Sequence, residues 1–214
     1  MNRTKIEYCD YTWNPIKGLC PEACWYCYAR RMYQRFKLDP KLRWAHESLK
    51  SYRIPPGSKI FICSTMELFH PQVPKSWRDS IFEEIKKNTH MTFIILTKRP
   101  ELIDRTMSDN VWLGVSVTGA DDWYRVGQLA SARACIKFVS IEPFLGKTPR
   151  IQKKDKLDWI IVGRLTGHGR TQDPEYSAIG WIIAQATELE IPIFMKDNLK
   201  DILHCAPLIQ EFPK

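Results

Sequence analysis

The sequence contains no apolar run of about 18 residues, the length that a transmembrane helix requires. Its first residues, Met1 to Lys5, lead into no apolar segment, so we expect no secretory leader and a cytoplasmic protein with reduced thiols. Repeats and low-complexity segments are also missing. The 214 residues therefore predict one domain, spanning residues 1–214, that does not associate with a membrane.

Cysteine usage argues against a disulfide framework. The seven cysteines are an odd number. No second Cys-x-x-Cys pair or His pair is present, although a structural zinc site usually takes its four ligands from two such pairs. A lone fourth ligand, such as Cys9 or His46, would still complete a zinc site, so this alternative stays open.

Three cysteines stand close together, at Cys20, Cys24 and Cys27, with three residues in the first gap and two in the second. Iron–sulfur clusters are normally held by four thiolates. Three thiolates on one turn would hold three corners of a [4Fe–4S] cluster and leave the fourth iron open to a small molecule. This spacing, with the aromatic Tyr26 just before the last cysteine, resembles the signature of the radical S-adenosylmethionine (radical SAM) superfamily.

Positive charge is unevenly distributed along the chain. The net charge is +8, and the segment from Tyr28 to Lys59 holds nine basic and two acidic residues, a surplus of seven. The same segment carries five aromatic residues, Tyr28, Tyr33, Phe36, Trp44 and Tyr52. Basic residues interleaved with aromatics suit a nucleic-acid groove. A solvated helix face with its aromatics in the core gives the same pattern, and a phosphorylated small substrate is a third interpretation.

Apolar runs alternate with helical spacing along the whole chain, which predicts an α/β fold with a mainly parallel sheet. Both an open sheet and a full or partial (β/α) barrel fit this alternation. The expected strands are 7–13, 59–64, 92–97, 111–117, 137–141, 159–162 and 191–195, and the expected helices are 22–36, 74–87, 101–107, 121–134 and 176–189. The basic segment at about 37–58 is the longest irregular connection, and we expect it to be a lid or a binding insert.

Polar residues gather where the expected strands end. They are Ser64-Thr65, Thr97-Lys98, Ser116, Glu142, Arg164 and Lys196-Asp197. In barrels and in open parallel sheets this end carries the active site. The cysteine loop follows the first expected strand, so we expect the metal at the same end.

Several segments resemble a compact, phage-associated family that is related to radical SAM enzymes and described largely as a domain of unknown function. The resemblance covers the chain from about Tyr11 to Asp197. It rests on Thr12-Trp13-Asn14-Pro15, Ser64-Thr65-Met66-Glu67-Leu68-Phe69-His70, Leu96-Thr97-Lys98-Arg99-Pro100, Trp112-Leu113-Gly114-Val115-Ser116-Val117 and Ser140-Ile141-Glu142-Pro143-Phe144-Leu145-Gly146. It implies a partial (β/α) barrel of six or seven mainly parallel strands.

The resemblance also implies cofactors and site residues. Cys20, Cys24 and Cys27 would hold the cluster, whose fourth iron SAM would chelate, and Tyr26 would approach the adenine. Five further residues would complete the SAM site. Ser64, Thr65 and Glu67 would occupy the segment that takes the amino group, Lys98 would pair with the carboxylate, and Ser116 would bond the carboxylate or ribose.

The implied reaction is reductive cleavage of SAM to methionine and a 5′-deoxyadenosyl radical, which removes a hydrogen atom from the substrate. The electron would come from an external flavodoxin-like or ferredoxin-like donor. We expect Glu142 and Arg164 to be catalytic, and the substrate to be acidic, either a nucleic acid or a nucleotide. The run from Gly163 to Gly169 departs from the family's Gly-Gly-Glu-Ser-Gly pattern, because the acidic residue is lost and a basic residue, Arg164, is gained. A non-catalytic zinc or iron–sulfur module, or an electron-transfer protein, is the alternative.

Overall fold

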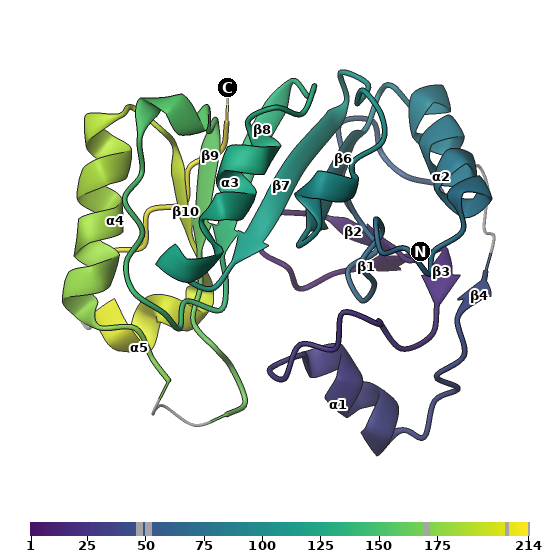
Figure 1. The fold of residues 1–214 in the computed structure, drawn as a ribbon, viewed down its shortest axis with the longest axis horizontal. Coiled ribbons are helices and arrows are strands. Elements are labelled where there is room, and N and C mark those ends of the chain that lie inside the picture. Colours follow the sequence, from purple (N-terminus) through teal and green to yellow (C-terminus); the bar gives the residue numbers. More distant parts are fainter. Residues whose placement is uncertain (46–48, 50–52, 169–171, 204–205, 214) are drawn as a thin grey trace. The chain divides into compact units, whose positions relative to one another are not determined.

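The computed structural model describes residues 1–45, 49, 53–168, 172–203 and 206–213. The chain divides into two compact units, residues 1–112 and residues 113–214 (Figure 1). His46, Tyr52 and Gly169, which entered the sequence analysis, lie outside the described residues, as does part of the basic segment 37–58. No described helix has the length and the apolar composition that a membrane span requires.

The first unit is built on a small sheet in the order β1-β2-β5-β6. The antiparallel strand β1 (Asn2–Arg3) precedes three parallel strands, β2 (Tyr11–Trp13), β5 (Lys59–Ile62) and β6 (Thr92–Thr97). Trp13 lies opposite Ile62, and Ile62 lies opposite Ile95, so the three strands end at the same edge. Residues that follow these strands are therefore brought together there.

Helix α2 (Lys75–Lys87) contributes to the core of the first unit. The buried residues of this helix, Ile81, Phe82 and Ile85, lie on one helical face. The strands β3 (Ile16–Lys17) and β4 (Arg43–Trp44) form a separate antiparallel pair. Helix α1 (Tyr28–Arg35) lies between them in the chain (Figure 1).

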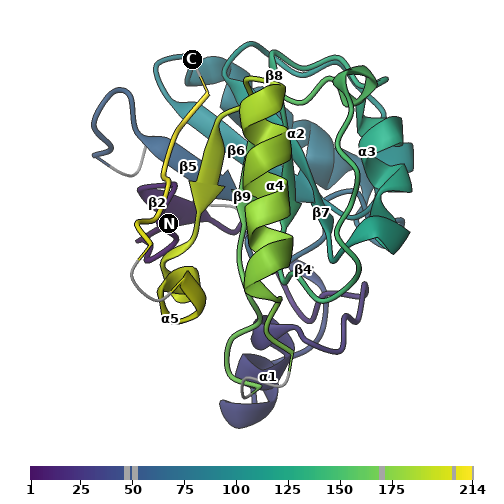
Figure 2. The same cartoon turned by 90° about the vertical axis from the view of Figure 1, so that its left-hand side faces the viewer.

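The second unit repeats the same construction. Strand β7 (Val111–Val117) begins at the unit boundary and leads into the order β7-β8-β9-β10. Strand β8 (Ile136–Ile141) pairs in parallel with β9 (Trp159–Val162), which pairs in parallel with β10 (Ile193–Met195). Helix α4 (Tyr176–Glu188) lies over these strands, and α3 (Tyr124–Leu129) and α5 (Lys200–Leu203) complete the unit (Figure 2).

Close packing in the second unit requires glycine at one strand position. A Cβ atom at Gly114 of β7 would come within 2.4 Å of the Phe138 ring on β8. Real Cβ atoms do not approach so closely, so any side chain here would force the large buried Phe138 to move. The absence of a side chain at Gly114 therefore lets the Phe138 ring of β8 pack directly against β7.

The predicted α/β class with mainly parallel strands is confirmed. Three strands have the bounds predicted, namely 92–97, 111–117 and 159–162. Each is a mostly apolar segment that is buried almost throughout, as is typical of parallel strands. The expectation of a single domain over residues 1–214 stays a prediction.

Other predicted elements have different bounds in the structure, and most of them are shorter. The helix predicted at 22–36 begins only at Tyr28, because Ala23 has a positive φ of 54° and the Cys27 amide bonds back to the Cys24 carbonyl. The strand predicted at 7–13 begins at Tyr11, and those predicted at 59–64, 137–141 and 191–195 cover 59–62, 136–141 and 193–195. The helix predicted at 121–134 spans 124–129. The helices predicted at 74–87 and 176–189 are nearly right, at 75–87 and 176–188.

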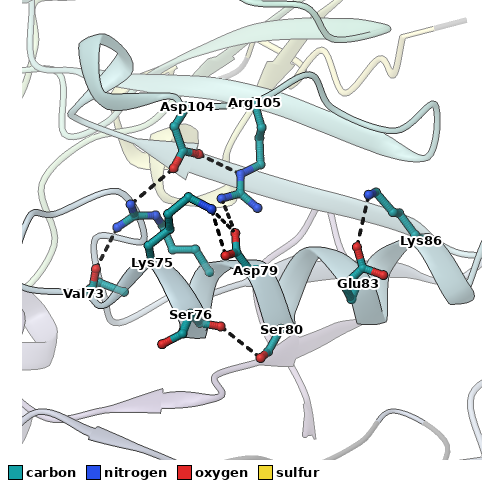
Figure 3. Close-up of polar contacts among 10 residues, drawn as sticks. Val73, Lys75, Ser76, Asp79, Ser80, Glu83, Lys86, Asp104 and Arg105 are labelled. Atoms are coloured by element: carbon teal, nitrogen blue, oxygen red, sulfur yellow. Dashed lines mark hydrogen bonds and ion pairs between the residues drawn. The ribbon is translucent and has the colours of Figure 1, made fainter.

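The helix predicted at 101–107 is a short 3-10 helix at Pro100–Leu102. The chain that follows it is held against α2 by ion pairs instead (Figure 3). The Arg105 guanidinium donates to Asp104 at 2.7 Å and to Asp79 at 2.9 Å, and it lies over the Phe82 ring. Arg78 donates to Asp104 from the helix. These side-chain bonds outweigh the weak helical spacing of the segment.

Candidate active site

The three cysteines lie on a loop between β3 and α1. We call residues 20–27 the cysteine loop. The positive φ of Ala23 and the bond from the Cys27 amide to the Cys24 carbonyl turn the chain within this loop, and Cys27 is the N-cap residue of α1. Cys20, Cys24 and Cys27 are free thiols of intermediate exposure. The local sequence therefore presents three thiols on one short turn.

Backbone amides hold the first of these thiols. The Glu67 N–H donates to the Cys20 sulfur at 3.3 Å, and the Glu22 N–H also bonds this sulfur. Burial raises the pKa of the Cys20 thiol, and the two amides oppose the shift. Amide hydrogen bonds to sulfur are among the features that tune iron–sulfur clusters.

Side chains tie the cysteine loop to the ends of β5 and β6. Arg99, just after β6, donates from Nε to the Glu22 carboxylate at 2.8 Å. Arg30 of α1 donates to the Cys20 carbonyl at 3.3 Å. The Tyr28 hydroxyl donates to the Ser64 carbonyl, just after β5, at 3.1 Å. The loop is thus anchored at its beginning and its end.

The cysteine loop has the thiol donors of an iron–sulfur site, but these donors are spread apart. Among the described residues, no three His, Cys, Asp or Glu side chains are gathered closely enough to hold a metal ion. Three thiols, with amides already directed at one of them, fit a cluster in donor type. Loading would draw the loop together, since metal sites commonly form as the metal binds.

Glu67 is buried beneath this loop and is fully engaged by the protein. Its Oε1 accepts from the Thr97 hydroxyl at 2.6 Å and from the Phe69 amide at 3.2 Å, and its Oε2 accepts from the Lys98 amide at 2.8 Å. Burial raises its pKa, although all three donors act in the opposite direction. The carboxylate therefore joins the segment after β5 to the end of β6.

The other predicted SAM contacts in the first unit lie around Glu67. The Lys98 ammonium is 5.9 Å from the centroid of the Tyr26 ring, a cation–π arrangement that brings the predicted carboxylate and adenine contacts together. Ser64 exchanges hydrogen bonds with Asn14 at 3.1–3.2 Å, and Thr65 is half-buried in the same turn. Cys63, which precedes this turn, is a buried thiol whose pKa is raised by burial.

The second unit brings three predicted residues together. The Ser116 hydroxyl donates to the Glu142 carbonyl at 3.3 Å, and the Glu142 carboxylate accepts from Lys196 at 2.6 Å. Gly163 lies under this pair, because a Cβ there would be 3.0 Å from Glu142 Cδ and from Lys196 Cδ. The ends of β7, β8, β9 and β10 therefore form one polar cluster.

Arg164 is a strongly held residue at the end of β9. Its Nη1 donates to both oxygens of Asp173 at 2.8 and 3.0 Å, and its Nε donates to the Asn198 carbonyl at 2.6 Å. Its backbone exchanges hydrogen bonds with the Asn198 side chain. Arg164 therefore joins the segment around Asp173 to the segment around Asn198. Its catalytic role stays a prediction.

Sequence reasoning missed several members of these clusters. The pairing of Glu22 with Arg99 joins positions that are 77 residues apart, and the partners of Arg164, Asp173 and Asn198, lie in separate loops. The sequence identified Thr97 only as a polar residue at the end of a strand, not as the hydrogen-bond donor to Glu67. A search for opposite charges among the residues that follow parallel strands would have suggested the Glu142–Lys196 pair.

Comparisons with known proteins agree with the fold. The model of a family described as "Protein of unknown function (DUF5131)" matches residues 3–200. Among solved structures, the chain is similar to a mutant of spore photoproduct lyase with bound AdoMet and dinucleoside spore photoproduct, with a TM-score of 0.54 and 12% sequence identity. The match covers 87% of this chain and 63% of that chain. It confirms the predicted α/β fold, which this chain shares with that protein. No curated protein is significantly similar in sequence.

Proposed function

The chain belongs to the DUF5131 family, and from this premise and the site geometry we propose that it is a radical SAM enzyme. The cysteine loop carries the proposal. It carries three thiols, and the first of them, Cys20, accepts a hydrogen bond from the Glu67 amide after β5. The fold is shared with a protein solved with bound AdoMet. In this proposal Cys20, Cys24 and Cys27 hold a [4Fe–4S] cluster.

The bound cluster would supply one electron for reductive cleavage of SAM to methionine and a 5′-deoxyadenosyl radical. The protein's own residues bind and orient SAM. Lys98 takes the SAM carboxylate and Tyr26 lines the adenine, since their side chains already lie together. Because the Glu67 carboxylate is buried and engaged by three protein donors, Glu67 supports the loop, and main-chain carbonyl groups near Ser64 and Thr65 receive the SAM amino group.

The polar cluster of the second unit serves the substrate in this proposal. Glu142 contacts the substrate, and Lys196 fixes the orientation of its carboxylate. Ser116 supports the Glu142 main chain as well as being a candidate contact to SAM. Arg164 is a positioning residue, because its donors are occupied by Asp173 and Asn198.

The charge of the chain bears on its partners. A net charge of +8 favours association with acidic molecules at low ionic strength. We propose that these include an external flavodoxin-like or ferredoxin-like electron donor and an acidic substrate. The neighbouring structure contains a dinucleoside, which is consistent with a nucleic acid or nucleotide here.

The test is anaerobic reconstitution of the full chain with iron, sulfide and SAM. We expect a brown protein that bleaches with dithionite and then forms 5′-deoxyadenosine and methionine, measured by chromatography. Cys24→Ala should abolish both colour and cleavage, whereas Cys135→Ala, at an exposed cysteine of the second unit, should retain both.

Three outcomes would overturn the proposal. A colourless protein loaded with zinc would indicate a structural metal module. A reducible cluster that cleaves no SAM would indicate electron transfer or sensing. Cleavage retained in Cys24→Ala would show that other residues hold the metal.

A further inference from the structure

Exposed aromatic and basic side chains extend from the end of the cysteine loop, along α1, to its C-cap residue. We call Trp25, Tyr28, Arg31, Arg35 and Phe36 the α1 face. The three aromatic residues are 61%, 55% and 61% exposed, respectively, although large apolar side chains are usually buried. Of the aromatic residues in the basic segment, Tyr28 and Phe36 are thus exposed, whereas Tyr33 and Trp44 are half-buried.

Helical geometry places three members of the α1 face on one side of the helix, whereas Trp25 precedes α1 and Phe36 is its C-cap residue. Tyr28, Arg31 and Arg35 are spaced three and four residues apart, so they follow one another along the helix surface. The opposite side packs on the protein through Ala29, which is buried, and Tyr33, whose hydroxyl accepts a hydrogen bond from the Gly18 amide. The α1 face is therefore the side directed to solvent.

Helix α1 contributes positive charge to this face. Helix α1 contains Arg30, Arg31 and Arg35 and no acidic residue. The two acidic residues that flank it in the chain already have basic partners: Glu22 pairs with Arg99 at 2.8 Å, and Asp39 pairs with Arg43 at 2.9 Å. The Arg35 guanidinium lies 5.4 Å from the Phe36 ring, so cation and ring form one continuous surface.

We propose that the α1 face binds single-stranded nucleic acid and carries it past the cysteine loop. Guanidinium groups between flat rings match a polyanion whose unpaired bases stack on the rings. A duplex hides its base faces, so exposed rings favour a single strand. A membrane surface would instead need a continuous apolar stripe, and Arg31 and Arg35 interrupt one here.

The position of the face links it to the proposed chemistry. Trp25 and Tyr28 flank Cys27 in the chain, and Tyr28 also bonds the main chain at Ser64. A strand stacked on these rings would therefore pass beside the proposed cluster. The inference rests on the proposed function only in naming its substrate class, because the binding itself needs neither cluster nor SAM.

The test is fluorescence anisotropy with the full chain and a labelled oligothymidylate, an oligouridylate and a DNA duplex of the same length. We expect the single strands to bind more tightly than the duplex, and the ratio between the first two distinguishes DNA from RNA. Trp25→Ala should weaken single-strand binding by about 5- to 150-fold, the range that corresponds to loss of one stacked base. Replacing both Arg31 and Arg35 with Gln should reduce the slope of log affinity against log salt by about 1.4, since each single-strand phosphate contact contributes about 0.7.

The matched control is Trp181→Ala. Trp181 is 60% exposed on α4, a helix of the second unit that carries no basic residue, and its loss should leave binding unchanged. Circular dichroism of each variant verifies that folding is retained.

Equal weakening by Trp181→Ala, equal affinity for duplex, or tighter binding to anionic phosphatidylserine vesicles would each overturn the inference. Oligonucleotide binding without SAM cleavage would refute the proposed function and leave this inference standing. SAM cleavage without oligonucleotide binding would refute this inference and leave the proposed function standing.

Discussion

The Glu67 amide nitrogen lies 3.3 Å from the Cys20 sulfur, while the carboxylate of the same residue is buried and held by Thr97, Lys98 and Phe69. One residue therefore connects the cysteine loop to the end of β6. The hydrogen bonds of its side chain fix the main chain that donates to sulfur. This relationship makes Glu67 a positioning residue for the proposed cluster.

Glu67→Gln tests this connection. An amide side chain has one acceptor oxygen and one donor nitrogen, so the nitrogen must face either the Lys98 amide or the donors at Oε1. A buried donor left without an acceptor costs about 1–3 kcal/mol. We expect the free energy of unfolding of the cluster-free protein, measured with urea, to fall by about that amount.

The matched control for Glu67→Gln is Glu83→Gln. Glu83 accepts from Lys86 in an exposed pair on α2 (Figure 3). Exposed pairs contribute little, so this change should stay within about 0.5 kcal/mol. If Glu67→Gln were as stable as the unaltered protein, Glu67 would not be the connection that we describe.

Glu22→Gln should loosen the cysteine loop. The change removes the charge-assisted bond between Glu22 and Arg99 but leaves the other anchors in place. We expect amide hydrogen exchange in residues 20–27 to rise about two- to fivefold, which corresponds to a loss of about 0.5–1 kcal/mol in local stability.

The control is Glu101→Gln, because Glu101 approaches the same arginine only at 3.9 Å. Its exchange in residues 20–27 should match the unaltered protein. Equal exchange in both variants would mean that the Glu22–Arg99 pair does not anchor the loop.

The parts of the fold that the sequence predicted well are those decided by burial. A strand such as Thr92–Thr97 is buried along almost its whole length, so its apolar run marks both ends. The start of α1 could not be predicted in this way. It depends on the positive φ of Ala23 and on a main-chain bond between Cys24 and Cys27, and neither has a strong sequence signal.

In the candidate site, too, local features were predictable and contacts between distant segments were not. The cysteine spacing and the polar strand ends are local, and both were visible in the sequence. The partners of Glu67 and Glu22 depend on which residues follow neighbouring strands, and the pairing of Glu142 with Lys196 spans three strand ends. Contacts of this kind follow from the order and register of the sheet, which periodicity alone does not give.

Acid should weaken the ion-pair network between α2 and the segment around Asp104 and Arg105 (Figure 3). The hydrogen bond from Arg105 holds the pKa of Asp104 below its usual value, and the bond from Lys75 does the same for the pKa of Asp79. A carboxylate whose pKa is lower in the folded state stabilises the protein above its unfolded pKa of about 3.9. That contribution is lost as the pH falls through the folded pKa.

Asp104→Asn measures this contribution. Near pH 7 the variant should be less stable than the unaltered protein by about 1 kcal/mol or less, because the pairs are partly exposed. The difference in free energy of unfolding should shrink below about pH 4, where the unaltered protein loses its own carboxylate. A difference that stays constant down to about pH 3 would contradict the assignment.

Gly163→Ala should disturb the Glu142–Lys196 pair. The new Cβ would lie 3.0 Å from Glu142 Cδ and from Lys196 Cδ, so the two side chains must shift by a few tenths of an ångström. Overpacking of this kind typically costs about 1–3 kcal/mol. We expect a loss in that range in the unaltered background, measured by urea unfolding.

The same substitution in a Glu142→Ala, Lys196→Ala background isolates the cause. The atoms that meet the Cβ are then gone, so the cost of Gly163→Ala should fall below about 0.5 kcal/mol. Gly180→Ala is the control for the residue type, because nothing lies within 4 Å of a Cβ at this position of α4. It should raise stability by about 0.5–1 kcal/mol, as alanine does inside a helix. An equal cost of Gly163→Ala in both backgrounds would show that Gly163 serves the backbone rather than the pair above it.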